Sequence, residues 1–124
     1  MKARTLALSA LTISIPLATA YSGDLTFYTP AAVAQFSSCN IAAAPGENIV
    51  AISHLQMNNA ANPNANPLCG TTITIYNPDA HIAVENVKIV DTCMGCADGS
   101  IDVNVELFQA LGYAPALGRC STLR

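Results

Sequence analysis

The sequence predicts a mainly β fold in one small domain, and three observations lead to this prediction. Residues 21–124 consist of short alternating segments separated by clusters of turn residues, no internal repeat is present, and only one segment has the features of a helix. Many short strands with one short helix, at this length, are typical of a small β-barrel or β-sandwich.

The expected strands are those segments in which apolar and polar residues alternate. The clearest is 71–76, where Ile73 and Ile75 share one face. The first expected strand stops before Pro30, because proline cannot donate to a strand ladder. The expected strands cover residues 24–28, 48–55, 71–76 and, as one strand or two, 82–91.

Two further segments are not expected to be strands. Residues 58–67 are rich in asparagine and proline, which populate turns and weaken a ladder, so we expect a loop there. Residues 105–111 are expected to form the helix, with Asn104 as its cap and Gly112 at its end.

The first twenty residues have the order of a secretory signal peptide. Lys2 and Arg4 precede an apolar run, and the small residues Ala18, Thr19 and Ala20 follow it. A buried N-terminal helix is the alternative interpretation. The apolar run is too short to span a membrane, so no anchor is expected. We therefore expect a signal peptide at residues 1–20, one domain at 21–124, and a secreted, extracellular protein.

The charge of the chain argues against some partners. Without the leader, three basic and eight acidic residues are left, a net charge of −5. With so few cations there is no basic patch to neutralise phosphates, so neither nucleic acid nor an anionic membrane is an expected partner.

Five cysteines follow the leader, at positions 39, 69, 93, 96 and 120. Two of them form the motif Cys93-Met94-Gly95-Cys96, which fits half a zinc site, a redox couple or a structural disulfide. Zinc would need a second ligand pair, and the two histidines lack zinc-like spacing. Turn residues rather than a helix follow the motif, which argues against a redox couple. In an oxidising compartment structural disulfides are the expectation, with no metal and no cofactor.

Three segments in order resemble a known family. LCGTTITIYNP, VKIVDTC and SIDVNVELFQALG resemble the strands and helix of rare-lipoprotein-A-like, barwin and expansin proteins, and most closely their short, single-domain, secreted fungal members. The resemblance covers residues 25–124. It implies a small six-stranded double-psi β-barrel with one or two short helices.

The resemblance also implies a binding groove. Asp91 matches the aspartate that protonates the leaving sugar oxygen in cell-wall hydrolases of this fold, and Thr26 and Tyr28 match groove residues. An apolar wall beside Asp91 would raise its pKa and suit a general acid. Alternatively, its carboxylate only accepts N–H groups of the Cys93 turn. Pro30 stands where the hydrolases have their catalytic base, so we expect the protein to bind polysaccharide without efficient hydrolysis.

Two other residues are weaker site candidates. His54 resembles the histidine paired with the aspartate in peptidoglycan-cleaving members, which would make a lytic transglycosylase using Asp91 an alternative function. Asp102 precedes the expected helix, and its negative charge would interact favourably with the positive end of the helix dipole. We therefore expect Asp102 to be mainly a structural residue, with a substrate contact as the alternative.

The barwin relatives imply the disulfide pairs. Their pattern joins Cys39 to Cys69 and leaves Cys93 to pair with Cys96, with Cys120 as a free thiol. A crossed arrangement, in which Cys39 joins Cys93 and Cys69 joins Cys96, is the alternative.

The expected function is that of a monomeric module that binds cell-wall polysaccharide (β-glucan, chitin or peptidoglycan) without efficient hydrolysis. A protein-binding role, as an inhibitor of papain-like cysteine proteases or a plant-interaction effector acting on a secreted target protein, is the main alternative. In that case the loop at 58–67 is the expected contact.

Overall fold

The computed structural model describes residues 20–123, with side chains described as far as residue 119, and shows one curled, six-stranded sheet. The order across the sheet is β3-β4-β2-β5-β1-β6. The fold is therefore mainly β, as expected. The strands are β1 (Gly23–Tyr28), β2 (Ile49–Ser53), β3 (Thr72–Asn77), β4 (Ile82–Cys93), β5 (Ile101–Asn104) and β6 (Arg119–Leu123).

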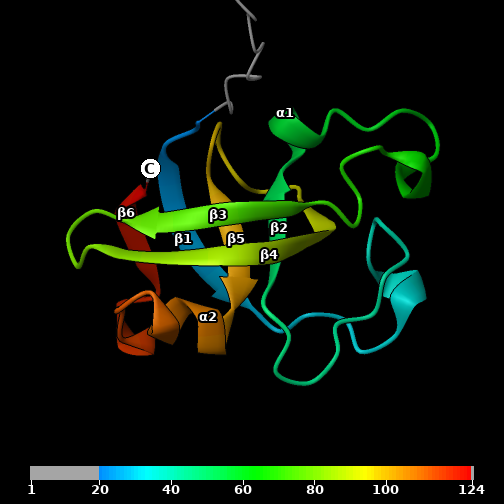
Figure 1. Ribbon diagram of the computed structural model, residues 1–124. Helices are drawn as coiled ribbons and strands as arrows, with labels where there is room; N and C mark the ends of the chain where they lie inside the picture. Colours follow the sequence, from blue (N-terminus) through cyan, green and yellow to red (C-terminus); the bar gives the residue numbers. More distant parts are fainter. Residues whose placement is uncertain (1–19, 124) are drawn as a thin grey trace, which may run out of the picture.

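The strand pairing mixes parallel and antiparallel neighbours. β1 runs parallel to β5 and β2 parallel to β4, whereas the other neighbouring pairs are antiparallel. β3 and β4 cross in front of the other strands in Figure 1, and β3 reaches β6 at the far edge. This contact between the two edge strands closes the sheet into a barrel.

Two short α-helices and three 3₁₀ turns complete the fold. α2 (Val105–Ala110) follows β5 directly, and Gly112, with φ +94°, occupies the left-handed region after it. The other elements are α1 (His54–Met57), η1 (Ala34–Phe36), η2 (Pro63–Ala65) and η3 (Pro115–Leu117).

Two local expectations need correction. Residues 54 and 55 are not in a strand, because the Ser53 side chain accepts the N–H of Leu55 at 3.2 Å and starts α1. Asn104 occupies the cap position of α2, but its Oδ1 accepts the N–H of Ile49 at 3.2 Å instead of a helix N–H, and its Nδ2 donates to the Glu106 side chain at 3.1 Å. Asn104 therefore joins β5 to the start of β2.

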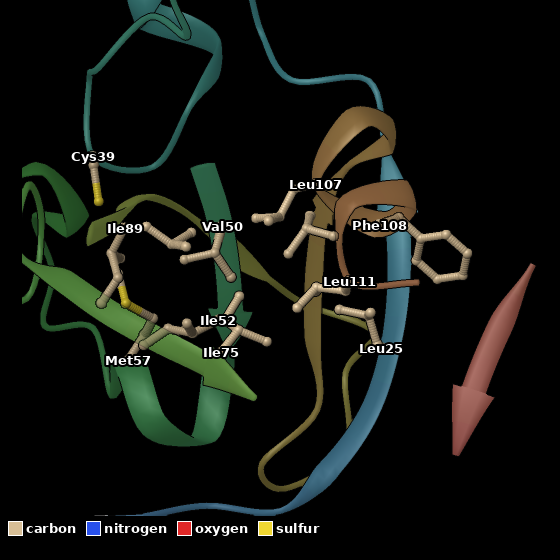
Figure 2. Packing of buried hydrophobic residues seen from close by; sticks show 12 residues of the cluster. Leu25, Cys39, Val50, Ile52, Met57, Ile75, Ile89, Leu107, Phe108 and Leu111 are labelled. Atoms are coloured by element: carbon tan, nitrogen blue, oxygen red, sulfur yellow. The ribbon is translucent and has the colours of Figure 1, made fainter. Parts of the chain in front are cut away.

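The barrel interior holds the hydrophobic core (Figure 2). Leu25 from β1, Val50 from β2, Ile89 from β4 and Phe108 from α2 are all nearly inaccessible to solvent. Inward-facing residues alternate along each strand, so their sequence neighbours point to the outer face. The outer face of the same strands is where the candidate site lies.

Two disulfides stabilise the fold: Cys39 with Cys69, and Cys93 with Cys96. These are the pairs that the barwin resemblance implied, and the crossed pairing is not present. Cys120 lies in β6, where its backbone pairs with Leu25; its side chain is outside the described residues, so the free thiol stays an expectation. Within residues 20–123 no helix has both the length and the apolar character needed to cross a bilayer.

Candidate functional site: an acidic face on the outside of the barrel

One row of residues crosses five neighbouring strands. The registers pair Asp91 with Ala51, Ala51 with Asp102, Asp102 with Thr26, and Thr26 with Arg119. Paired residues on adjacent strands project to the same face. Because strands lie about 4.8 Å apart, the backbones of Asp91 and Asp102 are about 10 Å apart, with only the methyl side chain of Ala51 between them.

Thr26 and Asp102 are joined directly. The Thr26 hydroxyl donates to Asp102 Oδ1 over 3.0 Å. Burial raises the pKa of the Asp102 carboxyl, the Thr26 hydrogen bond opposes this, and the charge of Asp91 adds to the rise. A raised carboxyl pKa is therefore found at Asp102, the residue that the sequence indicated first as structural. Asp102 lies in β5, and Glu106 is the acidic residue in the first turn of α2.

Tyr28 lies two residues beyond Thr26 on the same face of β1. Burial first, and then the charges of Asp91 and Asp102, raise the pKa of its hydroxyl well above the ordinary value. The hydroxyl oxygen is buried and has no hydrogen-bond partner among the described residues. The Tyr28 hydroxyl is thus an unsatisfied polar group that is buried near two carboxylates. We call Thr26, Tyr28, Asp91 and Asp102 the carboxylate face.

The Asp91 carboxylate is held at one oxygen. Its Oδ1 accepts the backbone N–H groups of Thr92 and Ser38, both over 2.8 Å. The sequence had offered acceptance of local N–H groups as the alternative to a role in the groove. One of the two donors is local, and the other comes from 53 residues away. Within residues 20–123 no hydrogen bond reaches Oδ2, so Asp91 has a structural role and still has an oxygen free for a ligand.

His54 is not joined to the carboxylate face by any described hydrogen bond. It starts α1, one residue beyond Ser53, which pairs with Cys93. Its Nδ1 is buried without a partner among the described residues. Pro30 lies two residues after the end of β1. Among the described side chains, no three His, Cys, Asp or Glu residues come together to hold a metal ion.

Arg119 is a site residue that sequence reasoning missed. It adjoins Thr26 in the row and forms an ion pair with Asp24 at 3.3 Å. A hollow of about 180 Å³ lies beside this pair, with Thr26 on one side and Cys93 and other residues of the disulfide turn on another. No local signal in the sequence could place Arg119 there, because the position depends on the β1–β6 register.

The aromatic residues divide between core and surface. Phe27 packs against Phe108 with ring centroids 4.9 Å apart, so it belongs to the core. Phe36, by contrast, is 72% exposed. Tyr76 is half-buried on β3, and its hydroxyl lies 3.3 Å from Nδ1 of His81, away from the row.

A larger hollow, of about 330 Å³, lies away from the row. It is enclosed by α1 and the segment of residues 58–68, which we call the asparagine loop, and none of the expected site residues lines it. In Figure 1 this loop lies at the right, on the same side as the connection between β1 and β2. Residues 58–67 of the asparagine loop were the segment expected to contact a protein partner.

The closed six-stranded sheet is a double-psi β-barrel, the fold that the resemblance to rare-lipoprotein-A-like, barwin and expansin proteins implied, and solved structures share this fold. The Streptomyces papain inhibitor has a TM-score of 0.71 and 25% identity, over 88% of this chain and 94% of its own. No protein-family model and no curated protein matches the sequence.

An expansin of Clavibacter michiganensis is a second neighbour. Its apo structure has a TM-score of 0.64 and 27% identity, and a point mutant in complex with cellohexaose has 0.63 and 28%. Each match covers 83% of this chain but 47% of the expansin, so the chain spans about half the expansin's length. Cerato-platanin 3 of M. perniciosa has a TM-score of 0.53 and 17% identity, over 82% of this chain and 89% of its own. At this identity it supports the fold alone.

Proposed function

We propose that the protein binds a neutral cell-wall polysaccharide on the carboxylate face and does not hydrolyse it efficiently. The observation that carries the proposal is the buried, unpartnered Tyr28 hydroxyl close to Asp91 and Asp102. An unpaired buried hydroxyl costs a fold about 1–3 kcal/mol, and a ligand that supplies the missing hydrogen bond recovers part of this.

Sugar hydroxyls fit the groups present. Each hydroxyl can donate to a carboxylate and accept from a tyrosine or threonine hydroxyl, so a sugar ring can pair with the free Asp91 oxygen and with Tyr28 together. The chain is net acidic, and two carboxylates lie in the row, so an anionic polymer would be repelled. A neutral β-glucan or chitin is thus favoured over acidic polymers, and a solved neighbour of this fold is in complex with cellohexaose.

Hydrolysis is proposed to be absent because Pro30 stands at the position that the resemblance gives to the base. Any hydrolysis would have to use the Asp91 and Asp102 carboxyl groups, since a carboxyl with a raised pKa, such as that of Asp102, suits a general acid. We expect no reducing ends to be released from β-glucans. Turnover that disappears in Asp91→Asn or Asp102→Asn would overturn this part of the proposal, and solubilised peptidoglycan fragments would instead indicate the transglycosylase.

The binding test is a pulldown on cellulose, chitin and peptidoglycan with wild type, Tyr28→Phe and Asp102→Asn. Retention of the wild type on at least one polymer, with weaker retention of both variants, is the expected result. Equal retention of all three proteins would place binding outside the carboxylate face. Retention of none of them would reject the proposal.

Protease binding is a second candidate, favoured by one observation. The papain inhibitor matches this chain over nearly its full length, whereas the expansin matches over about half of its own. Two exposed apolar residues, Leu55 on α1 at 55% and Met94 in the disulfide turn at 73%, are further candidates for protein contact. Loss of papain activity at stoichiometric protein, without polymer retention, would favour this function. A plant-interaction effector would act on a target other than papain, so it would show neither papain inhibition nor polymer retention.

We also propose that the protein is exported and that the mature chain starts at Tyr21. The two disulfides support an oxidising compartment. N-terminal sequencing of the protein recovered from culture medium tests this. A soluble, folded product that retains residues 1–20 would contradict the proposed cleavage.

A further inference from the structure

A chain of side-chain hydrogen bonds connects the asparagine loop to Asp91. The Nδ2 group of Asn66 donates to Oδ1 of Asn59 over 2.7 Å, and Nδ2 of Asn59 donates to the Thr92 hydroxyl over 3.0 Å. The hydroxyls of Thr92 and Ser38 lie 2.6 Å apart. Thr92 and Ser38 are the two residues whose backbone N–H groups hold Asp91 Oδ1.

The amide orientations in this chain are determined by their partners. Asn66 uses one Nδ2 hydrogen on the Met57 carbonyl at 2.7 Å and the other on Asn59, while its Oδ1 accepts the N–H of Leu68 at 2.9 Å. Asn59 must therefore accept with Oδ1 and donate with Nδ2. The Thr92 hydroxyl accepts from Asn59 and also shares a hydrogen bond with the Ser38 hydroxyl, in which either oxygen can be the donor.

The link between the Thr92 and Ser38 hydroxyls has a geometric consequence. It holds together two residues that are 54 apart in sequence, and both donate to the same carboxylate oxygen. The Cys39–Cys69 disulfide joins the residue after Ser38 to the end of the asparagine loop, and the N–H of Cys39 donates to the Val90 carbonyl at 3.3 Å. Both connections keep the Ser38 segment against the strand that carries Asp91.

We propose that the asparagine loop positions the Asp91 carboxylate, with Asn59 and Asn66 acting through the hydroxyls of Thr92 and Ser38. The loop orients Oδ1 and leaves Oδ2 directed to the ligand. A carboxylate that is already fixed loses less conformational freedom on binding, so affinity rises without a new contact to the ligand. The effect on affinity rests on the proposed polysaccharide binding, whereas the positioning itself does not.

The test uses amide hydrogen exchange and the proton chemical shift of the Ser38 N–H, which donates to Asp91. Wild type is compared with Asn59→Ala, which breaks the chain, and with Thr92→Val, which removes one hydroxyl at nearly constant volume. Asn64→Ala is the matched control, because the Asn64 side chain takes no part in the chain although it lies in the same loop. The amide of Val103, in the central strand β5, reports global opening.

We expect Asn59→Ala and Thr92→Val to accelerate Ser38 exchange by about fivefold or more relative to Val103 and to shift its resonance, because each removes two hydrogen bonds of the chain. Asn64→Ala should change neither. Oligosaccharide affinity should fall by roughly two- to tenfold in the first two variants only. Ser38 exchange that stays at the wild-type ratio in Asn59→Ala would overturn the inference. Accelerated exchange in a protein that binds no polysaccharide would retain the positioning and reject the proposed function instead.

Discussion

The hydroxyl of Thr26 donates to Oδ1 of Asp102 over 3.0 Å, across the neighbouring parallel strands β1 and β5. This contact connects residues 76 apart in sequence and lies at the centre of the row on the outer face of the barrel. Asp102 is half-buried and subject to the charge of Asp91, which makes the carboxylate face sensitive to pH and to single-atom substitutions.

The first prediction concerns Asp102 and pH. Because its pKa is raised from the ordinary 3.8, the folded state holds the proton more tightly than the unfolded state does. The stability contributed by this group is complete below the unfolded pKa and is lost as pH rises through the folded pKa. Denaturant unfolding from acidic to neutral pH should show this loss in wild type and not in Asp102→Asn.

Glu47 provides a control of opposite sign. A hydrogen bond from Lys88 is the main cause that lowers the Glu47 pKa from 4.5, so its stabilisation is present above that value and is lost as pH falls through the folded pKa. In Glu47→Gln, the loss of stability at falling pH should therefore disappear, whereas the loss of stability at rising pH that Asp102 causes should remain. An unchanged pH profile in Asp102→Asn would contradict the assignment.

The second prediction separates binding from stability at Tyr28. Because its hydroxyl has no described partner, Tyr28→Phe should leave the free energy of unfolding unchanged or raise it. The same change should weaken oligosaccharide binding by about 0.5–1.5 kcal/mol, roughly two- to tenfold. Thermal unfolding and calorimetric titration measure the two effects. A clear loss of stability would indicate that the hydroxyl has a structural partner.

The third prediction compares the two disulfides. The Cys39–Cys69 bridge joins residues 30 apart and the Cys93–Cys96 bridge residues 3 apart. Loop-closure entropy then assigns about 3–4 kcal/mol to the first and about 2 kcal/mol to the second. Denaturant unfolding of the two double-serine variants should reproduce this order. In non-reducing peptide maps, a fragment that joins Cys39 to Cys93 would contradict both assignments.

The fourth prediction concerns Gly99, which precedes β5. Its φ is +74°, and an added Cβ would lie 2.2 Å from the Ser22 carbonyl oxygen. Gly46 has nearly the same φ, +76°, but nothing within 4 Å of an added Cβ. Both alanine substitutions lower the free energy of unfolding because alanine is strained in the left-handed backbone conformation. Gly99→Ala should lower it by about 1–3 kcal/mol more than Gly46→Ala, and this difference measures the clash alone. Equal costs would mean that the chain entering β1 moves aside easily.

Much of the fold could be predicted from local pattern. The alternation at residues 24–28 and 71–76 predicted β1 and β3 to within one residue, because a half-buried strand must alternate. The pattern failed at residues 54–55, where the Ser53 side chain accepts a hydrogen bond from the Leu55 N–H and the chain turns into α1. Apolar periodicity carries no information about such a bond.

The candidate site was predictable as a set of residues but not as an arrangement. Thr26, Tyr28, Asp91 and Asp102 were named from sequence, with Asp91 as the buried acid. In the structure, Ser38 approaches from a distant part of the chain and fixes Asp91 at one oxygen, and burial raises the pKa of Asp102.

The sequence by itself determined most of the secondary structure, the cysteines available for pairing and the acidic balance, since these depend on composition and on neighbours a few residues apart. Only the tertiary structure decided that Asp91, Ala51, Asp102, Thr26 and Arg119 form one row. A shift of one residue in any of these registers would turn the side chains of that strand to the opposite face. Register depends on long-range packing of the whole barrel, and for that reason the site exists only in the folded chain.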